Sequence, residues 1–488
     1  RRQRQMCIRD STQTVFVATL VPRIQLERDP IMSKDFAVTN PATNEVVEKF
    51  DTFSDEQIQE VLAKSNEAFQ TWRETPIEER AKIVSRAAEL LKERKGELSK
   101  IAAQEMGKST PEGEWEINFS GDILQFYADN APEHNKDQPV DVPGGKATLR
   151  RLPIGTLLGI MPWNYPFYQV ARFAGPNLMN GNCIILKHAE ITPKSAAAIE
   201  EIFREAGLPE GVYINVYADH KQIEEIIGDK RVQGVSLTGS ERAGAAVAEI
   251  AGRNLKKVVL ELGSTDPYII LDAADITKAA EDAWVKRIEN VGQACTSNKR
   301  IIVMEDIYDE FVDEMVRIAE GMKQADPTQP GENQYYPMSS REAAENLDKQ
   351  VKTAVDNGAK VRTGGNLHET AAYYEPTVLT DVPVGSDSYY EEFFGPVAEI
   401  YKVSSEKEAV ELANNSNYGL GGAVFSDDTE RATKVADQIE TGMIHVNLGQ
   451  YFSPVLPFGG VKNSGFGREL SVFALDEFVN KQYLYIND

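Results

Sequence analysis

Residues 155–187 decide the fold, and their sequence is GTLLGIMPWNYPFYQVARFAGPNLMNGNCIILK. Residues 155–161 are a short apolar run typical of a buried strand, residues 166–179 have a helical pattern, and residues 183–186 are a second apolar run. A strand, a helix and a strand in this order predict a βαβ unit with parallel strands. Sheets built from such units bind ligands at the carboxyl ends of their strands.

The same alternation continues in two blocks. In the first block, further strands are predicted at 212–217, 235–237 and 258–262, with helices at 192–205, 221–227 and 241–251. In the second, strands are predicted at 268–271, 301–304, 397–401, 421–425 and 443–446, with helices at 276–289, 307–322, 341–357, 406–414 and 429–439. We therefore expect an α/β protein with two stacked open-sheet domains.

The flanking segments have other patterns. Turn residues at 39–45 predict a short hairpin, and helices are expected at 54–72, 76–106 and 111–127, the first opened by a capping box of Ser54 and Gln57. Residues 139–151 predict an exposed hairpin, and residues 482–486 are strand-like. Neither of these last two segments has an obvious partner in the two sheets.

Composition excludes several classes of protein. A chain of 488 residues with 41% hydrophobic residues predicts two or three globular domains. The net charge of −24 makes nucleic acid or an anionic membrane an improbable partner. Three cysteines without metal-ligand spacing predict neither a disulfide framework nor a metal site. This cysteine usage is typical of a reducing compartment, so we expect a protein of the cytoplasm. No apolar run reaches the length that a membrane helix requires.

Residues 1–31 differ from the rest, because they contain six Arg and only three acidic residues. Transit peptides share this composition. We prefer a second interpretation, since residues 1–11, RRQRQMCIRDS, match the in-frame translation of a transposon sequencing adapter. Residues 1–31 are then a non-native or disordered leader, and Met32 is the natural start.

Cys295 is the candidate nucleophile. Of the three cysteines, Cys7, Cys183 and Cys295, only the last lies among small and polar residues, between a helical pattern and a strand. A thiol at such a junction can meet a substrate. The alternative from spacing alone is a small buried apolar residue.

An ordered set of motifs resembles the aldehyde dehydrogenase superfamily over residues 35–488. The motifs are PWN at 162–164, Lys187, TGS at 238–240 with Gly244, ELG at 261–263, GQAC at 292–295, EFFGP at 392–396, PFGG at 457–460 and SGFGRE at 464–469. Residues 186–189 and 458–470 are most similar to bacterial-type succinate semialdehyde dehydrogenases.

The resemblance implies catalytic roles that agree with the chemistry of the residues. Cys295 would add to an aldehyde as a thiolate. The Asn164 amide and the Cys295 backbone N–H would stabilise the oxyanion. Glu261 would activate the water that hydrolyses the thioester. Glu469 would hold water or relay protons, the alternative being a surface salt bridge.

The resemblance also implies a dinucleotide site. Lys187 and Glu190 would bind the adenosine ribose, and the carboxylate favours NAD, with NADP possible. Gly239 and Ser240 would present a helix N-terminus to the pyrophosphate. The residues that would complete the cofactor site, beside the nicotinamide, are Trp163, Glu392 and Phe394.

The residues expected to contact the substrate do not all indicate the same kind of aldehyde. Arg172, expected two turns beyond Asn164 on one helix, matches an arginine that would bind a substrate carboxylate. Phe452 stands where a carboxylate-binding Ser is expected, with Ser453 next to it. Glu289 would repel a carboxylate unless Arg287 or Arg172 paired with it. Ser264 replaces a second Gly, and its side chain could crowd the nicotinamide or demand different dihedrals.

These expectations define a domain plan and a function. The plan is a leader at 1–31, a Rossmann-like NAD-binding domain at 32–135 and 152–262, a catalytic domain at 263–463, and a β oligomerisation arm at 136–151 and 479–488 that would form a homodimer or homotetramer. The function is NAD(P)-dependent oxidation of an aldehyde, with succinate semialdehyde first. The alternatives are another small aldehyde, transfer of the acyl group to coenzyme A, or a catalytically retired scaffold.

Overall fold

The computed structural model describes residues 35–487. The prediction of a non-native leader at residues 1–31 lies outside them. No helix within the described residues is both long enough and apolar enough to cross a membrane.

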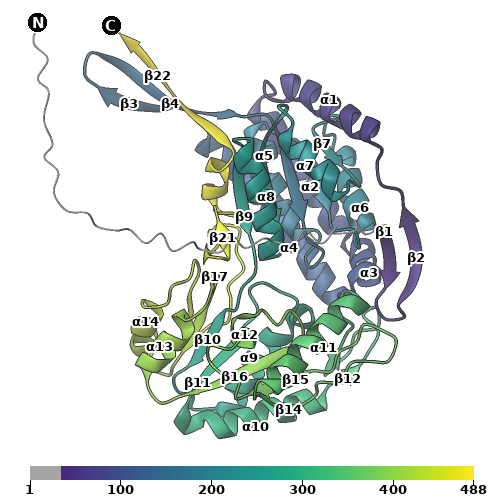
Figure 1. Ribbon diagram of the computed structural model, residues 1–488. Coiled ribbons are helices and arrows are strands. Elements are labelled where there is room, and N and C mark those ends of the chain that lie inside the picture. Colours follow the sequence, from purple (N-terminus) through teal and green to yellow (C-terminus); the bar gives the residue numbers. More distant parts are fainter. Residues whose placement is uncertain (1–34, 488) are drawn as a thin grey trace, which may run out of the picture. The chain divides into compact units, whose positions relative to one another are not determined.

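The first α/β region has a six-stranded sheet (Figure 1). Its strand order is β21 (Gly465–Phe466), β9 (Lys257–Glu261), β8 (Val232–Thr238), β5 (Thr156–Met161), β6 (Cys183–His188) and β7 (Tyr213–Asn215). All neighbours are parallel except β21, which runs antiparallel to β9. The intervening helices are α5 (Tyr168–Asn180), α6 (Pro193–Glu205), α7 (His220–Gly228) and α8 (Glu241–Arg253). The βαβ pattern predicted around residues 155–187 is confirmed.

The second region has a seven-stranded sheet. Its order is β14 (Lys360–Thr363), β15 (Thr377–Thr380), β16 (Val397–Val403), β11 (Arg300–Met304), β10 (Pro267–Ile270), β18 (Ala423–Phe425) and β19 (His445–Val446). Its helices are α9 (Ile276–Ile288), α10 (Glu305–Gly321), α11 (Arg341–Asp356), α12 (Asp387–Tyr390), α13 (Glu406–Asn414) and α14 (Thr429–Ala436). Strands β14 and β15 were not predicted, because β14, KVRT, is a polar, exposed edge strand and β15, TVLT, has two apolar residues between two threonines.

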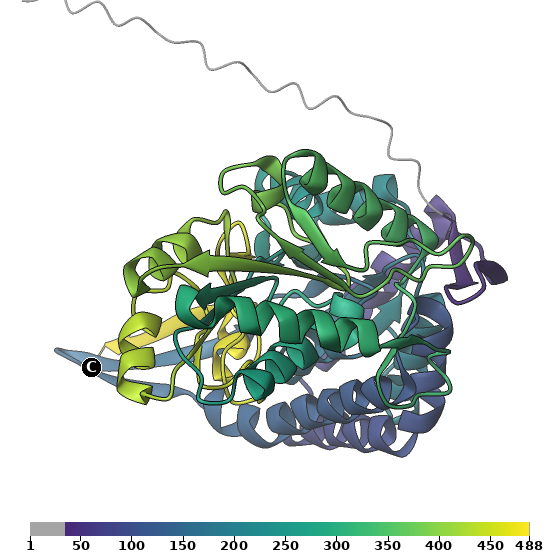
Figure 2. The same cartoon turned by 90° about the horizontal axis from the view of Figure 1, so that it is seen from below.

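A third sheet forms the predicted arm. Strand β4 (Gly145–Pro153) pairs antiparallel with both β3 (Gln138–Val142) and β22 (Val479–Asn487). The arm extends away from the neighbouring helices in both views (Figures 1 and 2). Several of its apolar side chains are exposed to solvent: Val140, Leu149, Tyr483, Tyr485 and Ile486.

The amino-terminal region is helical, as expected. It contains the hairpin β1 (Phe36–Asn40) and β2 (Glu45–Phe50), then α1 (Asp55–Trp72), α2 (Ile77–Glu93), α3 (Lys95–Met106) and α4 (Thr110–His134). The capping box of Ser54 and Gln57 is confirmed. The single helix predicted over 76–106 is wrong, because Arg94 has φ −98° and ψ 7° and separates α2 from α3. Helix α4 continues past the predicted end near residue 127, with Pro132 accommodated in its last turn.

Short pairings complete the described chain. Strand β12 (Lys323–Gln324) pairs with β13 (Gln334–Tyr335), and β17 (Tyr418–Gly419) pairs with β20 (Val461–Lys462). The β17–β20 pair and β21 bring the segment around residue 465 from the second region back to β9 of the first sheet. This return places late residues beside the end of β9.

Candidate active site

The loop before Cys295 has an uncommon backbone. Asn290, Val291 and Gly292 follow helix α9 with φ values of 51°, 58° and 72°. A β-branched residue in the left-handed region is strained, typically by about 1–3 kcal/mol. A Cβ at Gly292 would lie 2.2 Å from the Gly395 carbonyl oxygen, so only glycine fits there. The surrounding structure therefore imposes the conformation that delivers Cys295.

Buried polar side chains hold this loop. Arg287 donates to the carbonyls of Val397 at 2.7 Å, Phe393 at 2.9 Å and Gly292 at 3.3 Å. The amide oxygen of Gln293 accepts from the backbone N–H of Ser339 at 2.9 Å. These bonds fix the loop to the segment entering β16 and to the start of α11. Because Arg287 is engaged in this way, it does not pair with Glu289, and that part of the expectation is corrected.

Asn164 lies against the loop. Its Nδ2 donates to the carbonyl of Gln293 at 3.0 Å, and Nδ2 of Asn290 donates to the Asn164 carbonyl at 2.9 Å. Asn164 precedes helix α5, which begins at Tyr168, instead of lying on the same helix as Arg172. Pro166 between them explains the correction, since a residue before proline avoids helical dihedrals. The structure thus brings Asn164 and Cys295 together from different elements.

Two carboxylates lie behind them. Glu261 ends β9 and Glu469 pairs across an isolated bridge with Phe458, and both are almost completely buried. Neither oxygen of Glu261 has a hydrogen-bond partner among the described residues. Burial and the neighbouring Glu469 raise the pKa of Glu261 well above its ordinary value. A buried, unpaired carboxylate with a raised pKa can act as a base near neutral pH.

Arg172 is fully buried beside Glu469. Its Nε lies 2.6 Å from Glu469 Oε2, and its guanidinium stacks over the rings of Tyr168 and Phe458 at 4.6 and 4.2 Å. Its terminal nitrogens donate to Tyr168 and Gln169. The guanidinium expected to bind a substrate carboxylate is therefore already paired within the chain. The alternative of a surface salt bridge for Glu469 is corrected, because the pair is buried.

Cys295 is half-buried, and both positively and negatively charged side chains lie near its thiol. Burial raises its pKa to about 12; Arg172 and Lys299 oppose this, and Glu392 and Asp266 add to it. Two cations therefore favour the thiolate that nucleophilic attack requires. Lys299 was not singled out by the sequence analysis. The sequence feature that could have identified it is its position, four residues after Cys295 and directly before a buried strand.

Glu289 has a different partner from those expected. Its carboxylate lies 2.8 Å from Lys286 Nζ and accepts from the Tyr165 hydroxyl at 3.1 Å. Lys286 is thus the cation that offsets Glu289, in place of Arg287 or Arg172. The i,i+3 spacing on a helix could have indicated this pair. Lys286 also donates to Gln450 and lies 5.4 Å from the centre of the Phe452 ring.

Phe452 belongs to an aromatic wall. Its ring centre is 4.7 Å from that of Trp115 and 6.0 Å from that of Phe119. Cys295 packs against the same apolar cluster. Ser453 accepts from the Val455 N–H at 3.4 Å, so its hydroxyl is engaged locally.

The predicted adenosine and pyrophosphate residues lie at the ends of β6 and β8, which flank β5 in the sheet. Lys187, near the end of β6, forms an ion pair with Glu190. Ser240 caps the N-terminus of α8 and Gly239 precedes it. The buried Thr238 hydroxyl at the end of β8 has no hydrogen-bond partner among the described residues. The N-terminus of α8 beside an unpaired hydroxyl fits the pyrophosphate of a dinucleotide.

The predicted nicotinamide residues also gather. The Trp163 and Phe394 rings meet edge to face at 5.7 Å. Glu392 Oε1 lies 2.8 Å from Lys299 Nζ. A Cβ at Gly263 would be 2.7 Å from Glu392 Oε2, so glycine permits this close approach.

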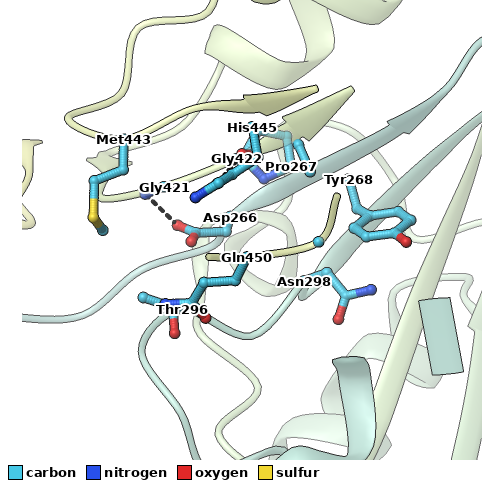
Figure 3. A pocket seen from close by; sticks show the side chains of 12 residues that line it. Asp266, Pro267, Tyr268, Thr296, Asn298, Gly421, Gly422, Met443, His445 and Gln450 are labelled. Carbon is cyan, nitrogen blue, oxygen red and sulfur yellow. Dashed lines mark hydrogen bonds between the residues drawn. The ribbon is translucent and has the colours of Figure 1, made fainter. Parts of the chain in front are cut away.

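The Ser264 side chain bonds to an acid outside this group. Its hydroxyl donates to Asp266 Oδ1, which also accepts from the Gly421 N–H at 2.9 Å (Figure 3). The φ of Ser264 is not positive. The concern that it demands glycine-like dihedrals is corrected. Asp266 lines a small pocket together with Thr296, Asn298, His445 and Gln450 (Figure 3).

Comparisons with known proteins agree with this geometry. The model of the aldehyde dehydrogenase family matches residues 29–484. A relative from Deinococcus radiodurans named succinate-semialdehyde dehydrogenase [NADP(+)] is 47% identical, covering 92% of this chain and 94% of its own. A probable succinate-semialdehyde dehydrogenase [NADP(+)] from Synechocystis is 39% identical, covering 92% and 99%.

A solved structure shows the same fold. The succinic semialdehyde dehydrogenase from Streptococcus pyogenes, in complex with NADP+, has a TM-score of 0.90 at 41% identity, covering 93% of this chain and 100% of that one. The match spans both sheets and the site between their strand ends. The chain belongs to the aldehyde dehydrogenase family and is an oxidoreductase of aldehydes.

Proposed function

We propose that the protein oxidises succinate semialdehyde to succinate with NAD(P), through a thiohemiacetal and a thioester on Cys295. The observation that supports it most is that the charge of Arg172 acts on both the Cys295 thiol and the unpaired Glu261 carboxylate, while Asn164 bonds to the loop that carries Cys295. The names of the similar proteins support the substrate.

In the first half of the reaction, the Cys295 thiolate adds to the aldehyde carbon and the carbonyl oxygen becomes an alkoxide. The Asn164 amide and the Cys295 N–H stabilise that charge, a contribution of about 10²–10³ in rate. The alkoxide then reforms a carbonyl, a hydride leaves the same carbon, and a thioester remains. The dinucleotide, when bound, supplies the hydride acceptor.

In the second half, Glu261 takes a proton from water, the resulting hydroxide adds to the thioester carbon, and the Cys295 thiolate leaves with release of the acid. A family member that transferred the acyl group to coenzyme A would not need this base. The buried Glu261 therefore supports hydrolysis. A Cys295→Ala variant that reduced the dinucleotide as fast as the wild type would support the scaffold alternative instead.

We propose that residues 32–135 and 152–262 form the cofactor domain and residues 263–463 the catalytic domain. Lys187 and Glu190 would bind the adenosine ribose, Gly239 and Ser240 the pyrophosphate, and Glu392 the nicotinamide ribose, with Trp163 and Phe394 beside the ring. The choice between NAD and NADP has support on both sides. The similar proteins are named for NADP+, whereas the Glu190 carboxylate repels the 2′-phosphate that distinguishes NADP from NAD. We assign the choice between NAD and NADP to Glu190.

Glu190→Ser tests this assignment. We expect kcat/KM for NADP to rise and that for NAD to fall, while kcat with saturating cofactor stays within about threefold. An unchanged ratio of the two efficiencies would remove Glu190 from cofactor selection. The matched control is Asp348→Ser on α11, whose carboxylate is paired with Lys352 as that of Glu190 is with Lys187.

The substrate assignment is tested with a panel of semialdehydes and uncharged aldehydes, each with NAD and NADP separately. Arg172 is the candidate for binding a substrate carboxylate. Because it is already paired with Glu469, the substrate would share the guanidinium with that residue. Phe452 and Trp115 favour the second candidate, a small aldehyde without a carboxylate. Higher kcat/KM for aliphatic or aromatic aldehydes than for succinate semialdehyde would select that alternative.

We also propose that the arm joins copies of the chain into a homodimer or homotetramer in a reducing cytoplasm. The support is the exposed apolar side chains on β4 and β22 and the absence of a disulfide among the described residues. A monomer by light scattering at micromolar concentration would contradict the assembly.

A further inference from the structure

Lys299 is a buried lysine behind the nucleophile. Its side chain is 0% exposed, and its Nζ donates to the carbonyls of Ala294 at 2.8 Å and Cys295 at 3.0 Å. The third contact of the ammonium is Glu392 Oε1 at 2.8 Å. Two of the three ammonium donors therefore bond to backbone carbonyls, and the ion pair with Glu392 offsets the charge.

These contacts join two segments that are far apart in sequence. Ala294 and Cys295 belong to the nucleophile loop, and Glu392 follows helix α12. Phe394 lies 5.7 Å from the ammonium by its ring centre, and the same ring meets Trp163. The lysine therefore sits between the reacting thiol and the residues that we assign to the nicotinamide ribose.

We propose that Lys299 is a positioning residue that couples the thiolate of Cys295 to the cofactor acid Glu392. Its ammonium orients the Cys295 peptide and favours the thiolate by charge, and Glu392 offsets part of that charge. This inference rests on the proposed function only in assigning Glu392 to the cofactor. The effect on the thiol is independent of any substrate.

Other charges also face the thiol. They are Arg172 and Tyr168 on α5, Asp266 before β10, and Glu392. Arg172 pairs with Glu469, and burial raises the pKa of Asp266, so Lys299 and Glu392 are the other pair of opposite charges that acts on the thiol. Removing Lys299 should raise the pKa of the Cys295 thiol, and removing Glu392 should lower it. A merely structural role would not produce shifts of opposite sign.

The test is the rate at which iodoacetamide alkylates Cys295, followed against pH without aldehyde or cofactor, with the labelled peptide identified by mass spectrometry. We expect Lys299→Met to move the profile to higher pH by about one unit, a tenfold loss of rate below the midpoint. Lys299→Gln keeps donors without charge and should follow Lys299→Met. Lys299→Arg should stay near the wild type.

Two further variants keep the proposal falsifiable. Glu392→Gln should move the profile to lower pH, and it does not depend on the folding of the lysine variants. Lys256→Met is the matched control, because Lys256 also donates to two carbonyls, those of Asp229 and Val232, far from the thiol. Shifts of equal sign in Lys299→Met and Glu392→Gln, or no shift in either, would overturn the proposal.

The link to the cofactor has its own readout. We expect Lys299→Met to raise KM for the dinucleotide by about tenfold, and to add little when Glu392 is already Gln. Additive effects of the two substitutions on KM would overturn the coupling. If the alkylation profile shifts but no aldehyde is oxidised, the proposed function fails and the role of Lys299 stands.

Discussion

Cys183 and Cys295 are the free cysteines among residues 35–487, and the pKa of each is raised to about 12. For Cys183, at the start of β6, burial is the only cause. For Cys295, burial is opposed by Arg172 and Lys299, and the thiol follows a strained turn that opens it to the site. Thiols with similar pKa values therefore differ in what surrounds them, and charges that can favour the thiolate are found only at Cys295.

Removing each thiol gives the largest contrast. Cys295→Ala should lower kcat by a factor on the order of 10⁶, the effect of deleting a nucleophile that acts with its partners as a unit. Cys183→Ala should leave kcat unchanged and cost about 1 kcal/mol of stability. Steady-state reduction of the dinucleotide and thermal unfolding measure the two effects. Equal kcat losses in both variants would erase the distinction.

Glu261→Gln should lower steady-state turnover by about 10²–10⁴, because a general base for hydrolysis is lost. Acylation should persist, so one burst of reduced dinucleotide per site is expected before the reaction stalls. Stopped-flow absorbance measures the burst. A uniformly slow reaction without a burst would place Glu261 in the first half of the reaction instead.

The pH dependence of hydrolysis follows from the same carboxylate. Its raised pKa means that the ionised form, which accepts the proton, is lost as pH falls through that pKa, at a higher pH than for an ordinary glutamate. Glu469→Gln removes a negative neighbour and should move this acid limb to lower pH. A limb that stayed in place would show that the two carboxylates do not interact.

Asn164→Ala should lower kcat by about 10²–10³ through loss of an oxyanion donor. Asn290→Ala is the control for the loop, since the buried Asn290 side chain donates to the carbonyls of Asn164 and Gln293. We expect it to reduce stability more than it reduces kcat. Equal kcat losses would assign Asn164 a loop-holding role only.

The smallest expected effect concerns the charges at Glu289. Lys286→Met leaves that carboxylate without its cation, and we expect KM for succinate semialdehyde to rise by about tenfold, equivalent to roughly 1.4 kcal/mol. Glu289→Gln should lower KM, and the double variant should lie between them. An uncharged aldehyde serves as the control, and a parallel rise in its KM would indicate a packing effect instead.

Much of this site could be predicted from the sequence, because the motifs fall at the ends of predicted strands. Cys295, Asn164 and Glu261 were placed at junctions, and the structure brings the elements bearing them to one region. The partners could not be predicted in the same way. Lys286 for Glu289, Glu469 for Arg172 and Asp266 for Ser264 depend on side-chain directions that are settled by packing.

The fold shows the same division. Apolar runs predicted the strands around β5 and β6, whereas β14, KVRT, has one apolar residue and β15, TVLT, has two. The break between α2 and α3 at Arg94 could not be predicted, because no Gly or Pro marks it in the sequence. The strained turn at Asn290 and Val291 also lacked a sequence signal, because the loop is held by contacts from distant segments.

The most direct test of the account is mass spectrometry of Glu261→Gln protein quenched after mixing with succinate semialdehyde and the dinucleotide. The account predicts an acyl group in thioester linkage on the peptide that contains Cys295, absent from Cys295→Ala and present only in trace amounts in the wild type. Reduction of the dinucleotide with no acyl group on Cys295, or with the acyl group on Cys183, would contradict it.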